Sequence, residues 1–334
     1  MPRVTLLALV ALLVYASPVS ASMPADLAAG AKRAGMPADG LESVESAPVA
    51  WIYEPETGGR QVTVVALAKL PAPAKTIVKN LKSSHGVLQS EAMRQMGIFG
   101  NPPGPKDVAR YRLPDSDLEV LSDCELEACK FKLSAQGVKN LEQIDWSAPD
   151  ARDRVDTLAR NGMVNFIRGY QERGHDALLV YADKEETQHQ ADAIEKLLGQ
   201  WGKTTSNWKT LRAHLNDYPN KNLDGVQDRF LWTVRDYGYR PVTGIIHAAL
   251  YEPPDGPVAG AIVLKNLYSS HYFLARLQLI GIYPDVKDPG ATYVAYIDRL
   301  LFDGDVGSIK RRMIQSGVVS DVRERLELFR KGLK

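Results

Sequence analysis

The sequence has almost no excess of charge of either sign. Among its 334 residues, 41 lysines and arginines are balanced by 40 aspartates and glutamates, so the formal net charge at pH 7 is only +1. A chain that attracts nucleic acid or an acidic polymer through its overall charge needs a clear positive excess. We therefore predict no nucleic-acid partner.

The short motifs of several enzyme classes are also missing. The sequence has no G-x-S-x-G nucleophile elbow, no H-E-x-x-H zinc motif and no glycine-rich phosphate-binding loop. Its histidines do not follow the spacing of a metal-ligand motif: they are His85, His175, His189, His214, His247 and His271. We predict no catalytic residue, no bound metal and no cofactor, and we favour binding without catalysis.

Long apolar runs are absent after the first residues. An apolar stretch at 5–16 follows Arg3, and small residues ending at Ala21 come after it. This pattern is typical of a secretory signal peptide, and we expect residues 1–21 to be cleaved as one. The stretch is shorter than the ~20 residues of a spanning helix, which leaves an uncleaved anchor as the weaker alternative. We therefore expect export to the periplasm or the extracellular space.

Cysteine is scarce, and its two copies lie close together. Cys124 and Cys129 stand in the segment LSDCELEACKFKL. Disulfides persist outside the cytoplasm, so the pair predicts a structural disulfide that fixes a local turn. A redox-active pair usually has the closer C-x-x-C spacing, and no histidine follows Cys129 for haem attachment.

The pattern of apolar residues predicts one α+β domain over 51–334, after an N-terminal arm at 22–50 that is loosely packed or forms a short helix. Within the domain we expect, in order, a strand at 60–70, a helix from Pro71, short strands at 108–121 and 129–134, and a helical insertion at about 148–219. Period-two patterns from residue 228 onward predict an antiparallel meander.

The chain ends in a segment with the pattern of a long amphipathic helix. Apolar residues recur at helical spacing opposite basic ones, the two sets being Val319, Val322, Leu326 and Phe329, and Arg323, Arg325, Arg330 and Lys331. The apolar side needs cover, so we expect a curved antiparallel sheet to pack on this helix. The basic side is expected to be solvated, with peripheral contact to an anionic membrane as the alternative.

The order of elements resembles the helix-grip fold of START-like lipid-transfer and polyketide-cyclase proteins. The resemblance rests on the opening VALAKLPAPAKTIVKNL at 65–81 and on the terminal amphipathic helix. It covers 60–134 and 225–334 and leaves the insertion unexplained. It implies an elongated apolar cavity between sheet and helix that binds a hydrophobic small molecule, and it carries over no catalytic residue.

Five polar residues within the predicted meander are candidate ligand contacts. Alternate residues of a strand share a face, which places His247 and His271 on the covered, apolar side of neighbouring strands. Lys265 and Tyr272 lie close to His271 in the sequence, and Arg299 suits a carboxylate or phosphate head group. The alternatives are hydrogen-bonded core histidines and, for Arg299, a surface ion pair.

These patterns predict an exported soluble protein that binds a hydrophobic or amphipathic small molecule such as a lipid. One alternative is a cell-envelope enzyme that uses His271 as acid or base, with Asp298 or a tyrosine as its partner. Another is a structural or interaction protein whose helical insertion is the partner surface.

Overall fold

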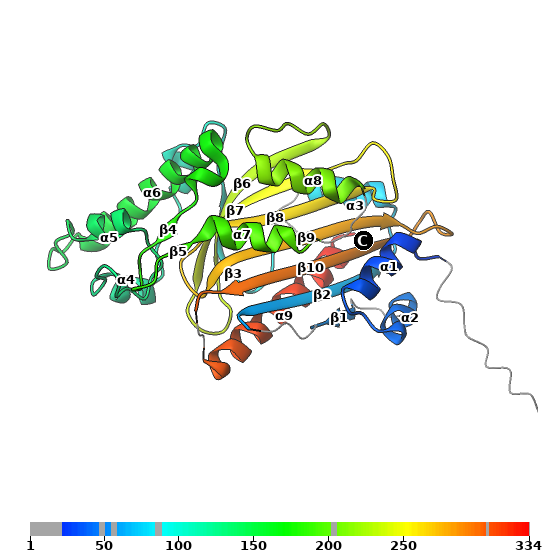
Figure 1. Cartoon of the computed structure of the whole chain (residues 1–334), viewed down its shortest axis with the longest axis horizontal. Coiled ribbons are helices and arrows are strands. Elements are labelled where there is room, and N and C mark those ends of the chain that lie inside the picture. The colour runs from blue at the N-terminus through cyan, green and yellow to red at the C-terminus, as the bar shows by residue number, and fades with distance from the viewer. Residues whose placement is uncertain are drawn as a thin grey trace, which may run out of the picture.

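An antiparallel sheet organises the part of the chain that the computed structural model describes, which is residues 22–46, 51–54, 59–83, 89–201, 206–304 and 307–333. The predicted signal peptide at 1–21 lies outside these residues. Within them the sheet has the strand order β1-β2-β10-β9-β8-β7-β6-β3 (Figure 1). Its strands are β1 Trp51–Tyr53, β2 Gln61–Leu70, β3 Met93–Ile98, β6 Val226–Arg235, β7 Val242–Tyr251, β8 Gly260–Ser269, β9 Phe273–Pro284 and β10 Thr292–Phe302.

Strands β6 to β10 are neighbours both in the chain and in the sheet, which confirms the predicted meander. β2 pairs with β10 at one side, and β3 pairs with β6 at the other, in both cases antiparallel. The coarse fold class, α+β with an antiparallel sheet and a C-terminal helix, is therefore confirmed.

Helices cover both faces of this sheet (Figure 1). One face carries α3 Ala74–Ser83 and α9 Ser308–Lys331, and the other carries α1 Ala25–Arg33, α7 Gln190–Gly199 and α8 Ser206–Asp217. The remaining described elements are α2 Ala38–Ser46, η2 Pro105–Val108, α4 Asp115–Leu121, α5 Ala135–Leu141, α6 Ala151–Arg173, η3 Gly174–Ala177, and the hairpin β4 Val180–Tyr181 and β5 Gln188–His189. No helix in these residues is long and apolar enough to cross a membrane.

The alternation of strand residues builds two separate cores. On β2, Val64 and Ala66 pack with residues of α9, whereas Val65 and Leu67 pack in the core on the opposite face. Every residue of β7 and β8 is buried, because both faces of the sheet are covered. An antiparallel sheet commonly leaves one face to water. Here helices cover both faces, so polar residues of β7 and β8 are removed from solvent whichever face they are on.

The interface between α9 and the sheet holds a buried ionic network. Arg276 donates to both carboxylate oxygens of Asp298, at 3.0 and 2.6 Å, and Arg235 donates to Asp321 of α9 at 2.7 Å. Arg325 also pairs with Asp321. The hollow lined by these arginines has a volume of about 30 Å³, the share of about one water molecule. This hollow is much smaller than the elongated cavity that the resemblance implies.

Arg325 corrects the expected division of the terminal helix. It was predicted on the solvated basic side, but only 2% of its side chain is exposed, and it faces the sheet. The prediction was wrong because helical spacing alone cannot show that a buried carboxylate, Asp321, lies one turn earlier and pairs with it.

Two predicted strands are wrong. Residues 115–121 form α4, with Pro114 just before the helix and Asp115 and Asp117 in its first turn, where acidic groups favour a helix. Residues 129–134 form no strand and make isolated backbone bonds, such as the one from the Lys132 amide to the Ser270 carbonyl at 2.9 Å. The predicted disulfide between Cys124 and Cys129 is present.

The N-terminal arm is more ordered than one loosely packed segment. It forms α1 and α2, whose Leu27 and Leu41 are buried in the core. Glu45 of α2 pairs with Lys69 of β2 at 2.8 Å. The arm therefore covers part of the sheet face that α9 leaves free, and it forms one wall of a cavity.

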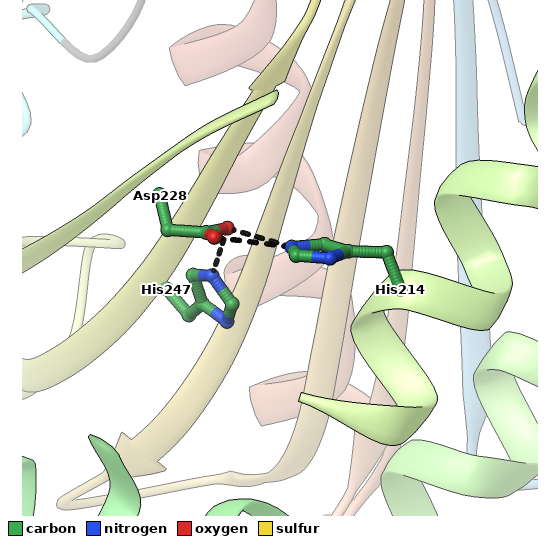
Figure 2. Close-up of side chains that lie close together, drawn as sticks. All are labelled: His214, Asp228 and His247. Carbon is green, nitrogen blue, oxygen red and sulfur yellow. Dashed lines mark hydrogen bonds and ion pairs between the residues drawn. The ribbon is translucent and has the colours of Figure 1, made fainter. Parts of the chain in front are cut away.

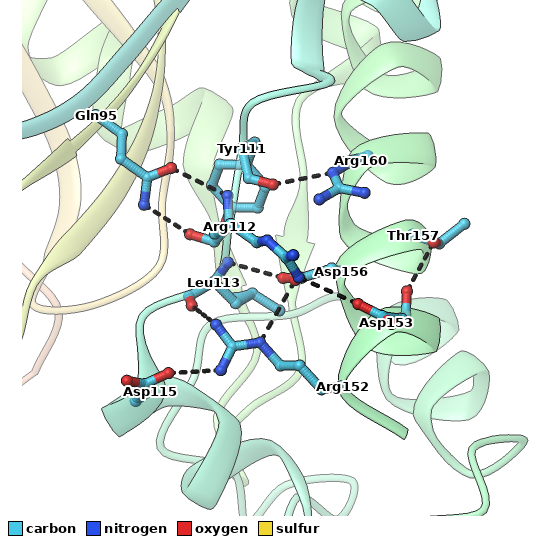
Figure 3. Close-up of polar contacts among 10 residues, drawn as sticks. All are labelled: Gln95, Tyr111, Arg112, Leu113, Asp115, Arg152, Asp153, Asp156, Thr157 and Arg160. Carbon is cyan, nitrogen blue, oxygen red and sulfur yellow. Dashed lines mark hydrogen bonds and ion pairs between the residues drawn. The ribbon is translucent and has the colours of Figure 1, made fainter. Parts of the chain in front are cut away.

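The helical insertion contains α6, α7 and α8, and polar contacts fasten α6 to the segment before α4 (Figure 3). Asp156 of α6 is fully buried, accepts from the Leu113 amide at 2.9 Å and pairs with Arg112 at 2.8 Å. Arg152 donates to the Leu113 carbonyl at 2.6 Å. Because the polar groups of this network are hydrogen-bonded to one another, we assign the network a structural role.

Candidate functional site: a cavity and a polar cluster on the sheet

A cavity of about 430 Å³ lies on the sheet face opposite α9, within the ~300–1,000 Å³ typical of small-molecule sites. Its floor comes from β2, β9 and β10, and its walls come from α1 and from the end of α7 and the start of α8. The lining is mainly apolar and aromatic and includes Leu27, Ala31, Met36, Val65, Leu67, Trp201, Trp208, Leu279, Tyr283, Ala295 and Ile297.

Arg299 lies in this cavity, and the sequence analysis predicted it as a ligand contact. On β10, Ala295, Ile297 and Arg299 are half-buried while the residues between them are buried, so this side of the strand faces the hollow. Among the described residues, the guanidinium has no hydrogen bond and no ion pair, and burial alone lowers the pKa of Arg299. Arg299 therefore does not form, with any described residue, the surface ion pair that was the alternative for it.

A second unused donor lines the same cavity. The indole Nε1 of Trp201 is buried, and no described residue accepts its hydrogen. The nearby Trp208 differs, because its Nε1 donates to the Tyr283 hydroxyl at 3.3 Å. The cavity therefore combines apolar walls with the unpaired guanidinium of Arg299, which an acceptor group of a ligand would satisfy. Its lining also holds the buried Trp201 N–H, which has no acceptor among the described residues.

A separate polar cluster lies on the same sheet face, under α8 (Figure 2). The Asp228 carboxylate contacts His247 Nε2 at 2.7 Å and His214 Nε2 at 3.0 Å. Both imidazoles are buried, whereas about 20% of the Asp228 side chain is exposed. Two histidines thus meet one carboxylate that water can reach.

Strand register places this cluster. His247 on β7 is directly opposite Phe230 on β6, so Asp228, two residues from Phe230, shares its face and is a diagonal neighbour of His247. α8 brings His214 over these strands. Gly174 ends α6 with φ of 57°, and a Cβ there would clash with the Tyr218 carbonyl. Glycine therefore allows the end of α6 to approach Tyr218 closely, and the Tyr218 ring in turn packs on His247.

Burial and hydrogen bonding shift the pKa values of the three cluster residues in different directions. Burial alone would raise the pKa of Asp228, but its bonds to His214 and His247 outweigh burial and lower that pKa well below its usual range. Burial lowers the pKa of His247 to about 4. Burial also acts to lower the pKa of His214, but the hydrogen bond to Asp228 prevails and raises it. Asp228 is therefore ionised at neutral pH.

Lys265, a second predicted contact, lies beside this cluster in the middle of β8. It pairs in register with His247 of β7, and its Nζ contacts His175 Nε2 at 3.0 Å and donates to the Leu215 carbonyl at 2.9 Å. Burial lowers the pKa of Lys265 to about 7. His175 lines an open hollow of about 540 Å³ outside the cluster.

His271 and Tyr272 are elsewhere, which corrects the expected grouping. They form the turn between β8 and β9, where Tyr272 has φ of 59°, and not a strand that places His271 beside His247. His271 Nε2 contacts Asp117 at 2.8 Å, and its Nδ1 donates to the Lys130 carbonyl at 3.0 Å. Neither of these turn residues lines the 430 Å³ cavity.

The five predicted contacts therefore fall into three places: Arg299 in the cavity, Lys265 and His247 at the cluster, and His271 and Tyr272 in a turn. Trp201, His214 and Asp228 were not among the predicted contacts. Asp228 did leave a signal, because it alternates with Phe230 and Trp232 on the buried side of β6. A charge in such a position needs a partner. His214 left none, since its contact with Asp228 depends on how α8 packs on the strands.

No protein-family model matches this sequence, and no curated protein matches it with significant similarity. The helix-grip resemblance thus stays a prediction from the order of elements. Function has to be inferred from the cavity and the cluster themselves.

Proposed function

We propose that the protein binds an amphipathic small molecule with an anionic head group in the 430 Å³ cavity. The observation that carries the proposal is Arg299, a half-buried cation of an apolar cavity that makes no ion pair with any described residue. An uncompensated buried charge is costly. A carboxylate or phosphate would remove that cost and form charge-assisted hydrogen bonds with the guanidinium.

The Trp201 indole supports the same ligand chemistry. Its unused N–H can donate to an acceptor but cannot accept, as is also true of Arg299. A cation or a pure hydrogen-bond donor would leave both groups unsatisfied. The ligand is therefore one with acceptor oxygens at one end and an apolar body.

The size of the cavity sets the scale of the apolar body. A volume of about 430 Å³ lies in the lower part of the roughly 300–1,000 Å³ range of small-molecule sites. Decanoate, with about 12 non-hydrogen atoms, is a small amphiphile suited to that range, and each buried CH₂ contributes about 0.8 kcal/mol. The cavity suits a single medium-length chain or a compact ring system.

The wider setting remains part of this proposal. Export is supported by the signal-peptide pattern at 1–21, and the disulfide is compatible with it. The helix-grip relation is supported by the order of elements. Our proposed binding face differs from the one that the resemblance implies, because it lies opposite the terminal helix.

Two measurements on the purified protein test the proposal. Native mass spectrometry should show a bound anionic amphiphile, or one decanoate per chain after its addition. Calorimetry should then give a tighter dissociation constant for decanoate than for decan-1-ol, which has the same chain without the charge. Absence of saturable decanoate binding, or equal affinity for the two, would contradict the proposal.

A further inference from the structure

The cluster of His214, Asp228 and His247 is not explained by ligand binding in the cavity. None of the three lines the 430 Å³ cavity. Each offers one ligand atom, and these atoms all lie within 4.8 Å of one another. Figure 2 shows the two imidazoles directed at the same carboxylate from different elements, α8 and β7.

The orientation of His214 is set from outside the cluster. Its Nδ1 lies 2.7 Å from the Lys221 carbonyl oxygen. A carbonyl can only accept, so Nδ1 carries a hydrogen. In the neutral ring, Nε2 then has a lone pair, which faces Asp228 at 3.0 Å. Two acceptors at this distance repel each other unless a proton or a metal cation lies between them.

His247 is fixed in a similar way. Its Nδ1 lies 3.2 Å from the Tyr170 hydroxyl, and the Tyr218 ring packs on its imidazole with centroids 4.7 Å apart. Its Nε2 faces Asp228. Both histidines therefore hold Nε2 toward one point and use Nδ1 for an outer hydrogen bond, which is the arrangement that orients histidine ligands in metal sites.

We propose that His214, Asp228 and His247 form a binding site for a divalent transition-metal ion, with Zn²⁺ as the ion that best suits the donor set. Two imidazole nitrogens and one carboxylate oxygen are common zinc ligands, and a water completes tetrahedral coordination. The partly exposed side chain of Asp228 gives the ion access. Tetrahedral bonds near 2.0 Å place ligand atoms about 3.3 Å apart, so the 2.7 Å contact must lengthen slightly.

The turn containing His271 provides an internal comparison. There too an imidazole bridges a backbone carbonyl and a carboxylate, but among the described residues Asp117 contacts a single histidine and is part of no group of three metal ligands. One proton between His271 Nε2 and the Asp117 carboxylate is enough to link these two groups by a hydrogen bond. Asp117 is therefore the matched control for Asp228, because each carboxylate contacts a buried imidazole and only Asp228 contacts two.

The test uses the untagged full chain, stripped with a chelator and titrated with Zn²⁺ by calorimetry. The wild type should bind one ion per chain. Asp228→Asn and His214→Gln should weaken binding by about 100-fold or more, because even an outer partner of a ligand contributes about 10–100-fold. Asp117→Asn and His189→Ala should bind as the wild type does. Neither cysteine can act as a thiolate ligand while both form the disulfide.

A second measurement needs no variant and therefore does not depend on correct folding of a mutant. X-ray absorption at the zinc edge of the loaded wild type counts imidazole ligands. Two imidazoles with nitrogen and oxygen donors near 2.0 Å support the site. Absence of stoichiometric binding, fewer than two imidazoles, or equal binding by Asp228→Asn overturns the proposal and leaves the cluster as a hydrogen-bonded ion pair.

Discussion

Asp298 and Arg299 are adjacent in β10, yet their side chains lie on opposite faces of the sheet and meet opposite surroundings. Asp298 is fully buried under α9, where Arg276 and Gln278 bond its carboxylate. Arg299 faces a cavity and has no partner among the described residues. On the α9 face each of these buried charged groups has a partner of opposite charge within the fold, whereas on the other face Arg299 has none among the described residues. This difference distinguishes a structural ionic network from a candidate binding site.

Removing Asp298 should cause the largest loss of stability. In Asp298→Ala, Arg276 stays buried without its carboxylate, and breaking such a pair costs about 3–5 kcal/mol. Urea denaturation measures the free energy of unfolding. Glu327→Ala, which removes a half-exposed acid of α9, is the control and should stay within about 0.5 kcal/mol. Similar losses in the two variants would refute a special role for the network.

The α9 face should also respond to acid. Burial would raise the pKa of Asp321, but Arg325 and Arg235 outweigh it and hold that pKa well below the unfolded value of about 3.9. Below about pH 4 the unfolded state therefore binds more protons, and stability is lost as pH falls toward the folded pKa. The contribution, of order 2 kcal/mol, should disappear in Asp321→Asn. Unfolding free energies from pH 5 to pH 2 should show a shallower slope for this variant, and identical slopes would exclude Asp321 as a source.

On the cavity side, a substitution should change ligand affinity. Trp201→Phe keeps an aromatic ring but removes the unused N–H, so decanoate affinity should fall by about two- to tenfold, the range of one hydrogen bond of about 0.5–1.5 kcal/mol. Trp208→Phe serves as the matched control, since that N–H already donates to Tyr283. If calorimetry finds the same loss in both variants, the Trp201 donor has no specific role.

Arg299→Gln should have the smallest effect on stability. No described residue pairs with Arg299, so its replacement breaks no ion pair and removes an unpaired charge from an apolar cavity. Its free energy of unfolding should lie within about 0.5 kcal/mol of the wild type or above it. A loss as large as that of Asp298→Ala would mean that Arg299 is a structural residue, and the contrast between the faces would fail.

Local patterns predicted much of the fold, because strand and helix periods depend on neighbouring residues. The β2 strand, the following helix, the meander and the terminal helix are all present. Strand predictions were wrong where tertiary contacts, which the local pattern does not show, determined the structure. Residues 115–121 alternate enough to suggest a strand but begin a helix after Pro114. The segment 129–134 makes only isolated backbone bonds and no ladder.

The candidate site was less predictable, because it depends on which elements meet. Arg299 could be singled out as a charge within an apolar strand, and the structure places it in a cavity. The helix expected to close that cavity, α9, instead packs on the opposite face. His214 and Asp228 could not be linked to His247 from their spacing, since α8 and the register of β6 with β7 bring them together.

The most direct test of the account is the dissociation constant for decanoate in Arg299→Gln against the wild type, measured by calorimetry with Arg33→Gln as control. Arg33 lines the same cavity but is exposed. A charged hydrogen bond of about 1.5–3 kcal/mol corresponds to a loss of about tenfold or more. We expect this loss in Arg299→Gln, with the decanoate affinity of Arg33→Gln and the decan-1-ol affinity almost unchanged. Unaltered decanoate binding in Arg299→Gln would contradict it.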